Sequence, residues 1–212
     1  MNYTEIVDLA LSYADRSDTE VSSRMDAFLR IVEAKISRRL AVMNMSVRTL
    51  LATQEGQEFY TLPTDYAGLR DIEIREDIGS SSRSTLQYLS PEQMNNFSSL
   101  NKVYGSGRGK GVYYTLVTNQ IQIQPIQAGG KVLEIIYYRK VIPLSPIAAE
   151  NWVSLSDPDL YVFGLLVEIS SFTKDAGALQ IWQQRFEETL EAVEVDDSDS
   201  RWAGTALQIR LG

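Results

Sequence analysis

The chain has 212 residues, of which 44% are hydrophobic, and its 28 acidic and 20 basic residues give a net charge of -8. It contains neither histidine nor cysteine. Catalytic sites that depend on a His or Cys side chain, disulfide bonds and the usual zinc ligand sets are therefore excluded. We expect a soluble globular protein that is not an enzyme and that holds no metal and no cofactor.

Charge is unevenly distributed along the sequence. Residues 91–140 contain six basic and two acidic residues, for a net +4, whereas residues 141–200 contain two basic and twelve acidic residues, for a net -10. This asymmetry favours oriented contacts with charged surfaces over bulk nucleic-acid binding, which requires a strongly basic domain. The acidic first 16 residues do not resemble a signal peptide, and the longest apolar run, Leu160 to Val167, is too short to span a membrane.

Two helices are predicted at the N-terminal end. The first covers about residues 2–14, with Ile6 and Ala10 on its apolar face. The second begins after the polar residues 17–20, which offer an N-cap. Its apolar residues step by threes and fours: Val21, Met25, Phe28, Leu29, Val32, Ile36 and Leu40.

The middle of the chain changes to the period of two that is typical of strands. Residues 43–51 alternate in this way, and a turn at Thr118-Asn119 predicts a hairpin. Ser90 followed by Pro91 predicts the start of a short helix. Six further strands are expected, at residues 59–62, 69–75, 86–89, 112–117, 120–124 and 131–138.

Helical periodicity returns after Asp157-Pro158, and two apolar stretches predict an antiparallel helical hairpin. We expect Gly177 to lie in the turn that ends the first of these helices, and residues 196–200 to end the second. The remaining segment is expected to be an extended tail that docks its apolar residues on its own sheet or on a neighbour. Those residues are Trp202, Leu207, Ile209 and Leu211.

These elements predict an α+β fold in which helices and strands are segregated. The N- and C-terminal helices are expected to form a helical bundle, with a central, mostly antiparallel β module and an extended C-terminal tail. The predicted divisions are residues 1–41 for the N-terminal helices, 42–147 for the β-rich module, 148–197 for the C-terminal helical hairpin and 198–212 for the tail.

A glycine-rich segment at residues 105–111 carries Arg108 and Lys110. A phosphate-binding loop is disfavoured, because such loops lead into a helix and this one precedes the strand-like residues 112–117. A basic loop that touches DNA or an acidic partner, and a solvated loop without a binding role, both stay open.

Three further motifs favour ordinary structural roles. Ser171 with Lys174 matches a Ser-x-x-Lys dyad, but its companion motifs are missing. Asp197 and Asp199 lack the glycine and glutamate that a calcium loop needs in the following positions. Glu187, Glu188, Glu191 and Glu194 are expected to form a solvated helix face rather than an acid-base pair.

Aromatic residues next to cations, as at Tyr137-Tyr138-Arg139-Lys140, are compatible with stacking on nucleic-acid bases. Alternating aromatics are also ordinary in strands, and tyrosine is common at protein interfaces, so the structural interpretation is favoured.

Six segments between about residues 20 and 195 occur in an order that one known family shares. They are Ile36-Ser37-Arg38-Arg39-Leu40, Leu62-Pro63-Thr64-Asp65-Tyr66 with Leu69-Arg70, Tyr137-Tyr138, Pro143-Leu144-Ser145, Asn151-Trp152 and Asp157-Pro158-Asp159-Leu160-Tyr161-Val162-Phe163-Gly164-Leu165-Leu166. In this order they resemble the head-to-tail adaptor proteins of short-tailed bacteriophages, the family that includes tail tubular protein A. Members often carry Gly-x-Pro before the Tyr-bearing strand, where this chain has the glycine-rich residues 105–111.

The resemblance implies a structural virion protein at the head-tail junction, made in the host cytoplasm. It implies a homo-oligomeric ring, usually of twelve copies, between the portal protein and the tail nozzle protein, with genomic DNA passing through without sequence specificity and with no membrane involved. The helical part would meet the portal and the β module would face the tail. Alternatives are another virion ring or connector protein, or a nucleic-acid-binding module that uses the basic loop.

Three placements of residues follow as hypotheses. The tail residues Trp202, Leu207, Ile209 and Leu211 would contact the portal or the adjacent subunit. Arg108 and Lys110 would touch DNA or a partner. The carboxylates would line the channel and repel DNA, so that the genome slides instead of binding; they are Glu187, Glu188, Glu191 and Glu194.

Overall fold

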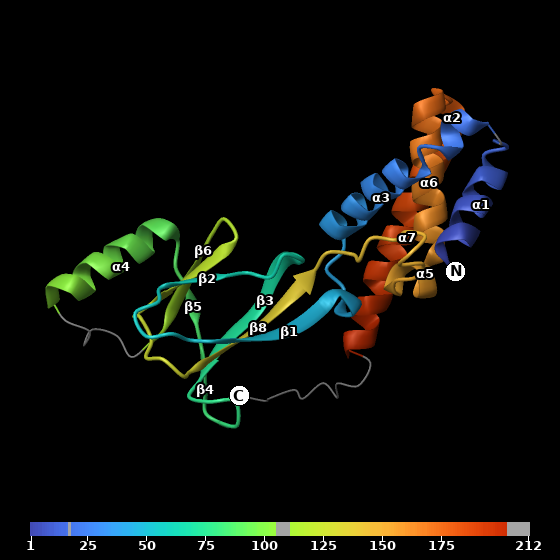
Figure 1. Cartoon of the computed structure of the whole chain (residues 1–212). Helices are drawn as coiled ribbons and strands as arrows, with labels where there is room; N and C mark the ends of the chain where they lie inside the picture. The colour runs from blue at the N-terminus through green and yellow to red at the C-terminus, as the bar shows by residue number, and fades with distance from the viewer. Residues whose placement is uncertain (17, 105–110, 203–212) are drawn as a thin grey trace, which may run out of the picture. The chain divides into compact units, whose positions relative to one another are not determined.

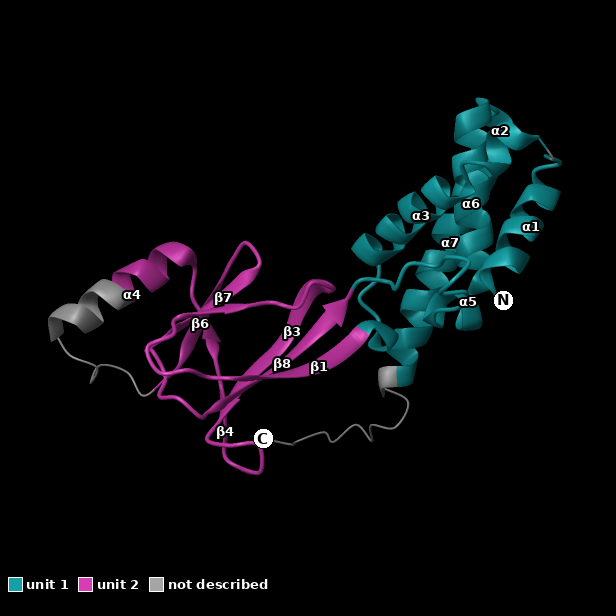
Figure 2. Cartoon of the chain, in the orientation of Figure 1, with its two compact units in different colours: residues 1–45, 140–212 teal, residues 46–139 magenta. Residues whose placement is uncertain are grey.

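The computed structural model describes residues 1–16, 18–104 and 111–202, with side chains for residues 1–16, 18–97 and 111–200 (Figure 1). Helices and strands are both present, in seven α-helices and two four-stranded sheets over the described residues, so the predicted α+β class is confirmed. The chain divides into two compact units (Figure 2). Residues 1–45 and 140–212 form the helical unit, and residues 46–139 form the β unit.

The N-terminal helices of the helical unit begin at side-chain caps. Helix α1, Tyr3–Tyr13, starts at Asn2, which forms a reciprocal capping box with Glu5. Asp18 caps the short helix α2, Thr19–Ser22, and α3 follows at Met25–Arg39. The prediction of one continuous second helix is therefore wrong, because the chain turns at Ser23 and Arg24. All seven residues of the predicted apolar stripe are nevertheless buried, since both helices turn the same face to the core.

Helix α6, Pro158–Thr173, is the central element of the helical unit (Figure 1). Its apolar residues run around most of the helix, and it contacts α1, α3, α7 and α5, the last being the short helix Trp152–Ser156. Gly164 lets α3 and α7 approach α6 closely. A Cβ atom placed there would lie 2.5 Å from Cγ1 of Val32 on α3 and 3.2 Å from Cε2 of Phe186 on α7.

The turn between α6 and α7, Ala176–Trp202, differs from the prediction. Lys174, and not a glycine, ends α6 in the left-handed conformation, with φ 59°. Gly177 lies inside α7. Asp175 begins α7 instead, because its side chain accepts a hydrogen bond from the Ala178 N–H at 3.0 Å.

The prediction that residues 196–200 end the last helix is also wrong, because α7 continues to Trp202. Asp and Ser are poor helix formers, but tertiary contact outweighs propensity here. The Asp197 carboxylate accepts a hydrogen bond from the Met43 N–H at 2.7 Å, which holds this part of α7 against the end of the N-terminal segment. Leu207, Ile209 and Leu211 of the expected tail lie outside the described residues.

The β unit contains two sheets whose strand orders are β1-β8-β3-β4 and β2-β7-β6-β5. All pairs are antiparallel except β5 with β6, and the hairpin predicted at Thr118-Asn119 joins β6 to β7. The first sheet consists of β1 Ser46–Ala52, β8 Val132–Arg139, β3 Tyr66–Arg75 and β4 Arg83–Thr85. The second consists of β2 Phe59–Thr61, β7 Gln120–Gln124, β6 Tyr113–Val117 and β5 Gln87–Tyr88.

Both sheets contribute to one apolar core. Its members alternate along the strands, as a sheet with one buried face requires. They include Tyr60, Ile72, Ile74, Leu86, Ile121, Ile123, Leu133, Ile135 and Tyr137.

Three details of this region differ from the sequence prediction. The first strand starts only at Ser46, because Met43–Met45 form a turn of 3-10 helix that buries Met45. Strand β4 was not predicted, since its three residues are exposed and carry no apolar pattern. The predicted short helix, α4, extends over Pro91–Tyr104. The conformation of the glycine-rich loop, with Arg108 and Lys110, lies outside the described residues.

Candidate functional site

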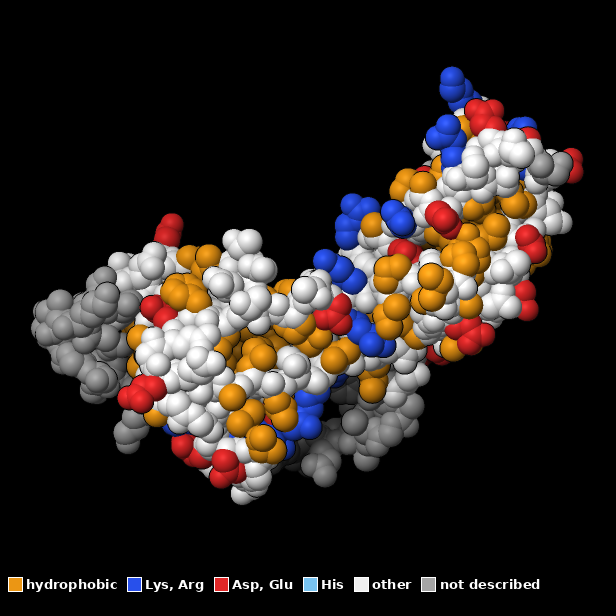
Figure 3. Space-filling view, viewed as in Figure 1, with side chains coloured by type: hydrophobic (Ala, Val, Ile, Leu, Met, Phe, Trp, Pro, Cys, Tyr) orange, Lys and Arg blue, Asp and Glu red, His pale blue; other side chains and the backbone are white. Residues whose placement is uncertain are grey.

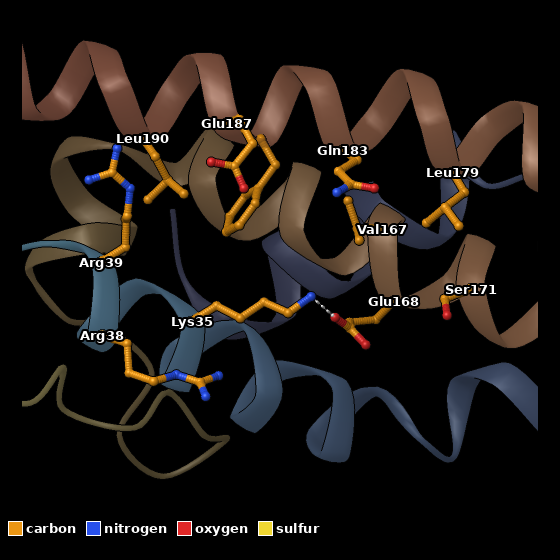
Figure 4. Close-up of a pocket in the computed structure, with 11 residues that line it drawn as sticks. Lys35, Arg38, Arg39, Val167, Glu168, Ser171, Leu179, Gln183, Glu187 and Leu190 are labelled. Atoms are coloured by element: carbon orange, nitrogen blue, oxygen red, sulfur yellow. Dashed lines mark hydrogen bonds and ion pairs between the residues drawn. The ribbon is translucent and has the colours of Figure 1, made fainter.

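Helices α3, α6 and α7 enclose a groove of about 550 Å³ (Figure 4). Three cations line it from α3, namely Lys35, Arg38 and Arg39. Glu168 of α6 and Glu187 of α7 face them, and Figure 4 shows Glu187 pointing from α7 toward the groove. The apolar part of the lining comes from Val167, Leu179, Phe186 and Leu190.

Two ion pairs connect α3 to its neighbours at this groove. Lys35 Nζ lies 2.6 Å from Glu168 Oε1, and Arg39 Nη1 lies 2.6 Å from Glu194 Oε1. Arg38 donates from Nε to the carbonyl oxygen of Ala34 at 3.0 Å, and no carboxylate of the described residues forms an ion pair with it. The groove therefore presents a guanidinium beside an apolar floor, an arrangement that suits a carboxylate or carbonyl group of a bound protein segment.

A buried hydrogen-bond network holds the segment that precedes α5 against α3 and α6. Glu33 Oε1 accepts from the Leu144 N–H at 2.6 Å and from the Tyr161 hydroxyl at 3.2 Å. Asn151 Nδ2 donates to the Tyr161 oxygen at 2.6 Å and to the carbonyl of Ile142 at 2.7 Å. Three motif segments, at residues 143–145, 151–152 and 157–166, therefore meet at one place.

The environment of this network shifts two pKa values. Burial raises the pKa of the Glu33 carboxyl, while the hydrogen bonds from Leu144 and Tyr161 oppose the shift. Burial also raises the pKa of the Tyr161 hydroxyl, and the nearby Glu33 adds to the increase. The raised pKa of Tyr161 keeps its hydroxyl protonated, so that it can donate to Glu33.

The solvent side of α3 carries cations around small and apolar residues. Ala27, Arg30, Ile31, Ala34 and Arg38 recur at spacings of three and four, all are exposed, and the exposed fraction of Ile31 is 42%. Figure 3 shows Lys and Arg side chains gathered along the edge of the helical unit where α3 lies.

The solvent side of α7 has the opposite charge. Ile181, Gln184, Glu188, Glu191 and Val195 lie on the face opposite the buried Phe186 and Leu190, and all five are exposed. The exposed fractions of Ile181 and Val195 are 57% and 60%, which is high for large apolar side chains.

The four predicted carboxylates of α7 lie on the side of the helix away from its buried stripe. Glu187, Glu188 and Glu191 are exposed, as expected for a solvated face. Glu188 accepts a hydrogen bond from Gln184 at 2.8 Å, and Glu187 borders the groove. Glu194 is partly buried, because it pairs with Arg39 of α3.

The other predicted site residues cannot be placed as side chains. Trp202 is the last residue of α7, and its side chain is outside the described residues. Arg108, Lys110, Leu207, Ile209 and Leu211 are also outside them.

The sequence-based prediction missed the cations of α3 as a candidate site. A signal was present, because Arg30, Lys35, Arg38 and Arg39 occur within ten residues and lie off the apolar stripe. The exposed apolar residues of α7 were also missed. Ile181 and Val195 differ from the buried apolar residues of this helix only in their position around the helix axis.

A second pocket, of about 410 Å³, lies near the end of α7. Asp157, Asp196, Asp197 and Trp152 are among its lining residues. Burial raises the pKa of Asp157, with further contributions from Asp159 and Asp196. Over the described residues, no three acidic side chains gather closely enough to hold a metal ion.

Comparison with known proteins places the whole chain in one family. The family model described as SU10 adaptor protein matches residues 1–210. A search among curated proteins finds no match. Among the described helices, none combines the length and apolar composition that crossing a bilayer requires.

Proposed function

The chain belongs to the SU10 adaptor protein family, a family of phage head-tail adaptors, and we propose that it forms the ring that joins portal to tail nozzle. The match over residues 1–210 carries this proposal, because it includes both units of the chain. The family resemblance inferred from the sequence motifs is thereby confirmed. The protein is a structural component of the virion.

In the proposed assembly, about twelve copies close into a ring around a channel through which genomic DNA passes, since identical subunits in head-to-tail contact close by rotation. The helical unit would meet the portal and the β unit would face the tail nozzle. Two units with separate hydrophobic cores support this division, because each can present a rigid surface to a different partner.

The groove between α3, α6 and α7 is a candidate place for a portal segment. It offers the Arg38 guanidinium beside the apolar side chains of Phe186 and Leu190. A protein segment with a carboxylate next to an aliphatic side chain would satisfy both. Arg38→Ala is expected to weaken portal binding, whereas Arg70→Ala, which removes an exposed arginine of the β unit, leaves it unchanged.

Mixing the purified chain with portal rings and measuring particle mass tests the proposed function. We expect a complex whose mass exceeds that of the portal by a multiple of the 23.9 kDa chain. A chain that stays monomeric beside portal would contradict the proposal. A nucleic-acid-binding module predicts instead that the isolated chain binds DNA in a salt-sensitive way, and that Arg108→Glu with Lys110→Glu abolishes this binding.

The proposed contact of the tail with portal or neighbour has its own test. A chain that ends after Trp202 keeps all of α7 but lacks the last ten residues. We expect it to bind portal rings more weakly than the full chain. Full-length protein with Leu207, Ile209 and Leu211 changed to serine should show the same loss if apolar contact is the cause, and unchanged binding of both proteins would remove the tail from the interface.

A further inference from the structure

We infer that the solvent face of α3 docks on the solvent face of α7 of a second copy of this chain. The inference rests on the proposed function, because a ring requires each subunit to offer two different surfaces to its two neighbours. It assigns those surfaces to the helical unit and names the residues that meet.

The face of α3 is suited to helix packing. Ala27 and Ala34 lie two turns apart on the solvent side, with Ile31 between them, and their small side chains let another helix approach closely. Arg30 and Arg38 flank this strip. Within the described residues, no carboxylate forms an ion pair with either arginine, although Arg38 donates from Nε to the carbonyl of Ala34.

The solvent face of α7 also combines apolar and charged side chains, but its charges are negative. Ile181 and Val195 expose large apolar side chains four turns apart, and Glu188 and Glu191 lie between them. Scattered exposed apolar residues are common in soluble proteins. Here they share one helix face with carboxylates of a single charge, as expected for the rim of a protein interface.

The charges determine which faces can pair. Two α3 faces would bring Arg30 and Arg38 against their own copies, and two α7 faces would bring Glu188 and Glu191 together, so both symmetric contacts are repulsive. Only α3 against α7 is attractive. That contact is head-to-tail, and repetition of a head-to-tail contact produces a ring when its rotation closes.

The chain already uses the same chemistry internally. Arg39 of α3 forms an ion pair with Glu194 of α7 at 2.6 Å within one subunit. The outer faces repeat this combination of helices, with the cation again on α3 and the carboxylate on α7. An intermolecular contact would extend this pattern to the neighbouring copy.

Charge reversal with mixing tests the inference. One protein carries Arg30→Glu with Ala34→Glu, which leaves Arg38 of the groove unchanged, and a second carries Glu188→Lys with Glu191→Lys. For each protein alone, the amount of ring assembled on portal is expected to fall by about ten-fold or more, because like charges then face each other. A mixture of the two should restore rings, since alternating copies have complementary faces at every contact.

Four outcomes are distinguishable. Failure of the wild-type chain to assemble on portal would overturn the proposed function itself. Normal rings from both reversed proteins would overturn only the inference. If the second protein formed normal rings but particles assembled with it retained DNA abnormally, Glu188 and Glu191 would be assigned to the channel lining instead. Loss without restoration in the mixture would show that the two faces do not meet each other, provided that circular dichroism shows both proteins to be folded.

Cysteine cross-linking supplies an independent readout, because the chain has no cysteine of its own. Ala34→Cys combined with Gln184→Cys places one thiol on each face. Oxidation of assembled rings is expected to give a ladder of covalent multimers on a denaturing gel. The matched control, Ala34→Cys with Ile147→Cys, moves one thiol to a side chain that is 99% exposed and lies off α7, and an equal ladder from the control would contradict the inference.

Discussion

Glu73 of β3 and Glu134 of β8 lie directly opposite each other in the first sheet of the β unit. Two carboxylates in this position repel unless cations separate their charges. Arg75 and Arg48 both form ion pairs with Glu134, whereas Arg83 lies 3.5 Å from Glu73. Glu134 and Arg75 are only 5% and 7% exposed, so the sheet contains a buried ion pair and, beside it, an exposed one.

The buried pair predicts a large loss of stability when one partner is removed. Glu134→Gln removes the carboxylate that is paired with the buried guanidinium of Arg75 and is expected to lower the free energy of unfolding by several times as much as its control. The matched control is Glu73→Gln, whose arginine partner is half exposed, and it should cost less than about 1 kcal/mol. Denaturant titration followed by tyrosine circular dichroism measures both values. Equal losses would contradict this account of the sheet.

The close packing around Gly164 predicts that a larger side chain at this position destabilises the helical unit. Gly164→Ala brings a methyl group against Val32 and Phe186 and is expected to destabilise the unit by about 1–3 kcal/mol. Tryptophan fluorescence follows this unit selectively, because all three tryptophans of the chain lie at positions 152, 182 and 202.

The second helical glycine of this unit serves as the control. Gly177→Ala has only Asp175 Oδ1 near its new methyl, at 3.6 Å, and should leave stability unchanged or raise it by up to about 1 kcal/mol. If both glycine variants lost the same stability, close packing at position 164 would not be the reason.

Glu33 predicts a dependence of stability on pH. Its pKa in the folded protein is raised above the ordinary value of 4.5, so the folded state binds this proton more tightly than the unfolded state. This contribution to the free energy of unfolding is fully present below about pH 4.5. It is lost as the pH rises through the higher pKa that Glu33 has in the folded protein. Glu33→Gln does not titrate and keeps an oxygen that can accept from Leu144 and Tyr161.

The measurement compares the wild type with Glu33→Gln at several pH values by thermal unfolding. The wild type should lose stability relative to the variant over the range of pH above about 4.5. A constant difference over this range would show that Glu33 has the same pKa in both states.

Lys174 predicts a stabilising substitution. It holds φ at 59°, a conformation in which a Cβ atom is strained and glycine is not. Lys174→Gly is expected to raise the unfolding free energy by up to about 1 kcal/mol. Lys174→Ala removes the same charge but keeps the Cβ atom, so it should show no gain in the same fluorescence titration. A stabilisation by alanine equal to that by glycine would assign the effect to charge.

Local patterns in the sequence determine much of this fold. The apolar stripe from Val21 to Leu40, an N-cap within residues 17–20 and the turn at Thr118 were all predicted, because each depends on neighbours within a few residues. The break at Ser23 was not predicted. The extension of α7 to Trp202 was also missed, because the contact of Met43 with Asp197 joins residues that are distant in sequence.

In the candidate site, too, features set by local sequence were predicted and features set by distant contacts were not. Periodicity places Glu188 and Glu191 on the outside of α7, as expected from the sequence. It does not show that Glu194 meets Arg39, because those residues are 155 positions apart and come together only when α3 packs beside α7. The groove likewise requires three helices from the two ends of the chain.

The two units differ in how their chain segments are arranged, and this difference affects synthesis. Residues 46–139 are continuous, so the β unit has all its strands once residue 139 has left the ribosome. The helical unit is interrupted, since α1 and α3 are made first but pack against α6, which begins only at Pro158. The apolar face of α3 therefore stays uncovered while the whole β unit is translated, and the nascent chain is most prone to misassociation during that interval.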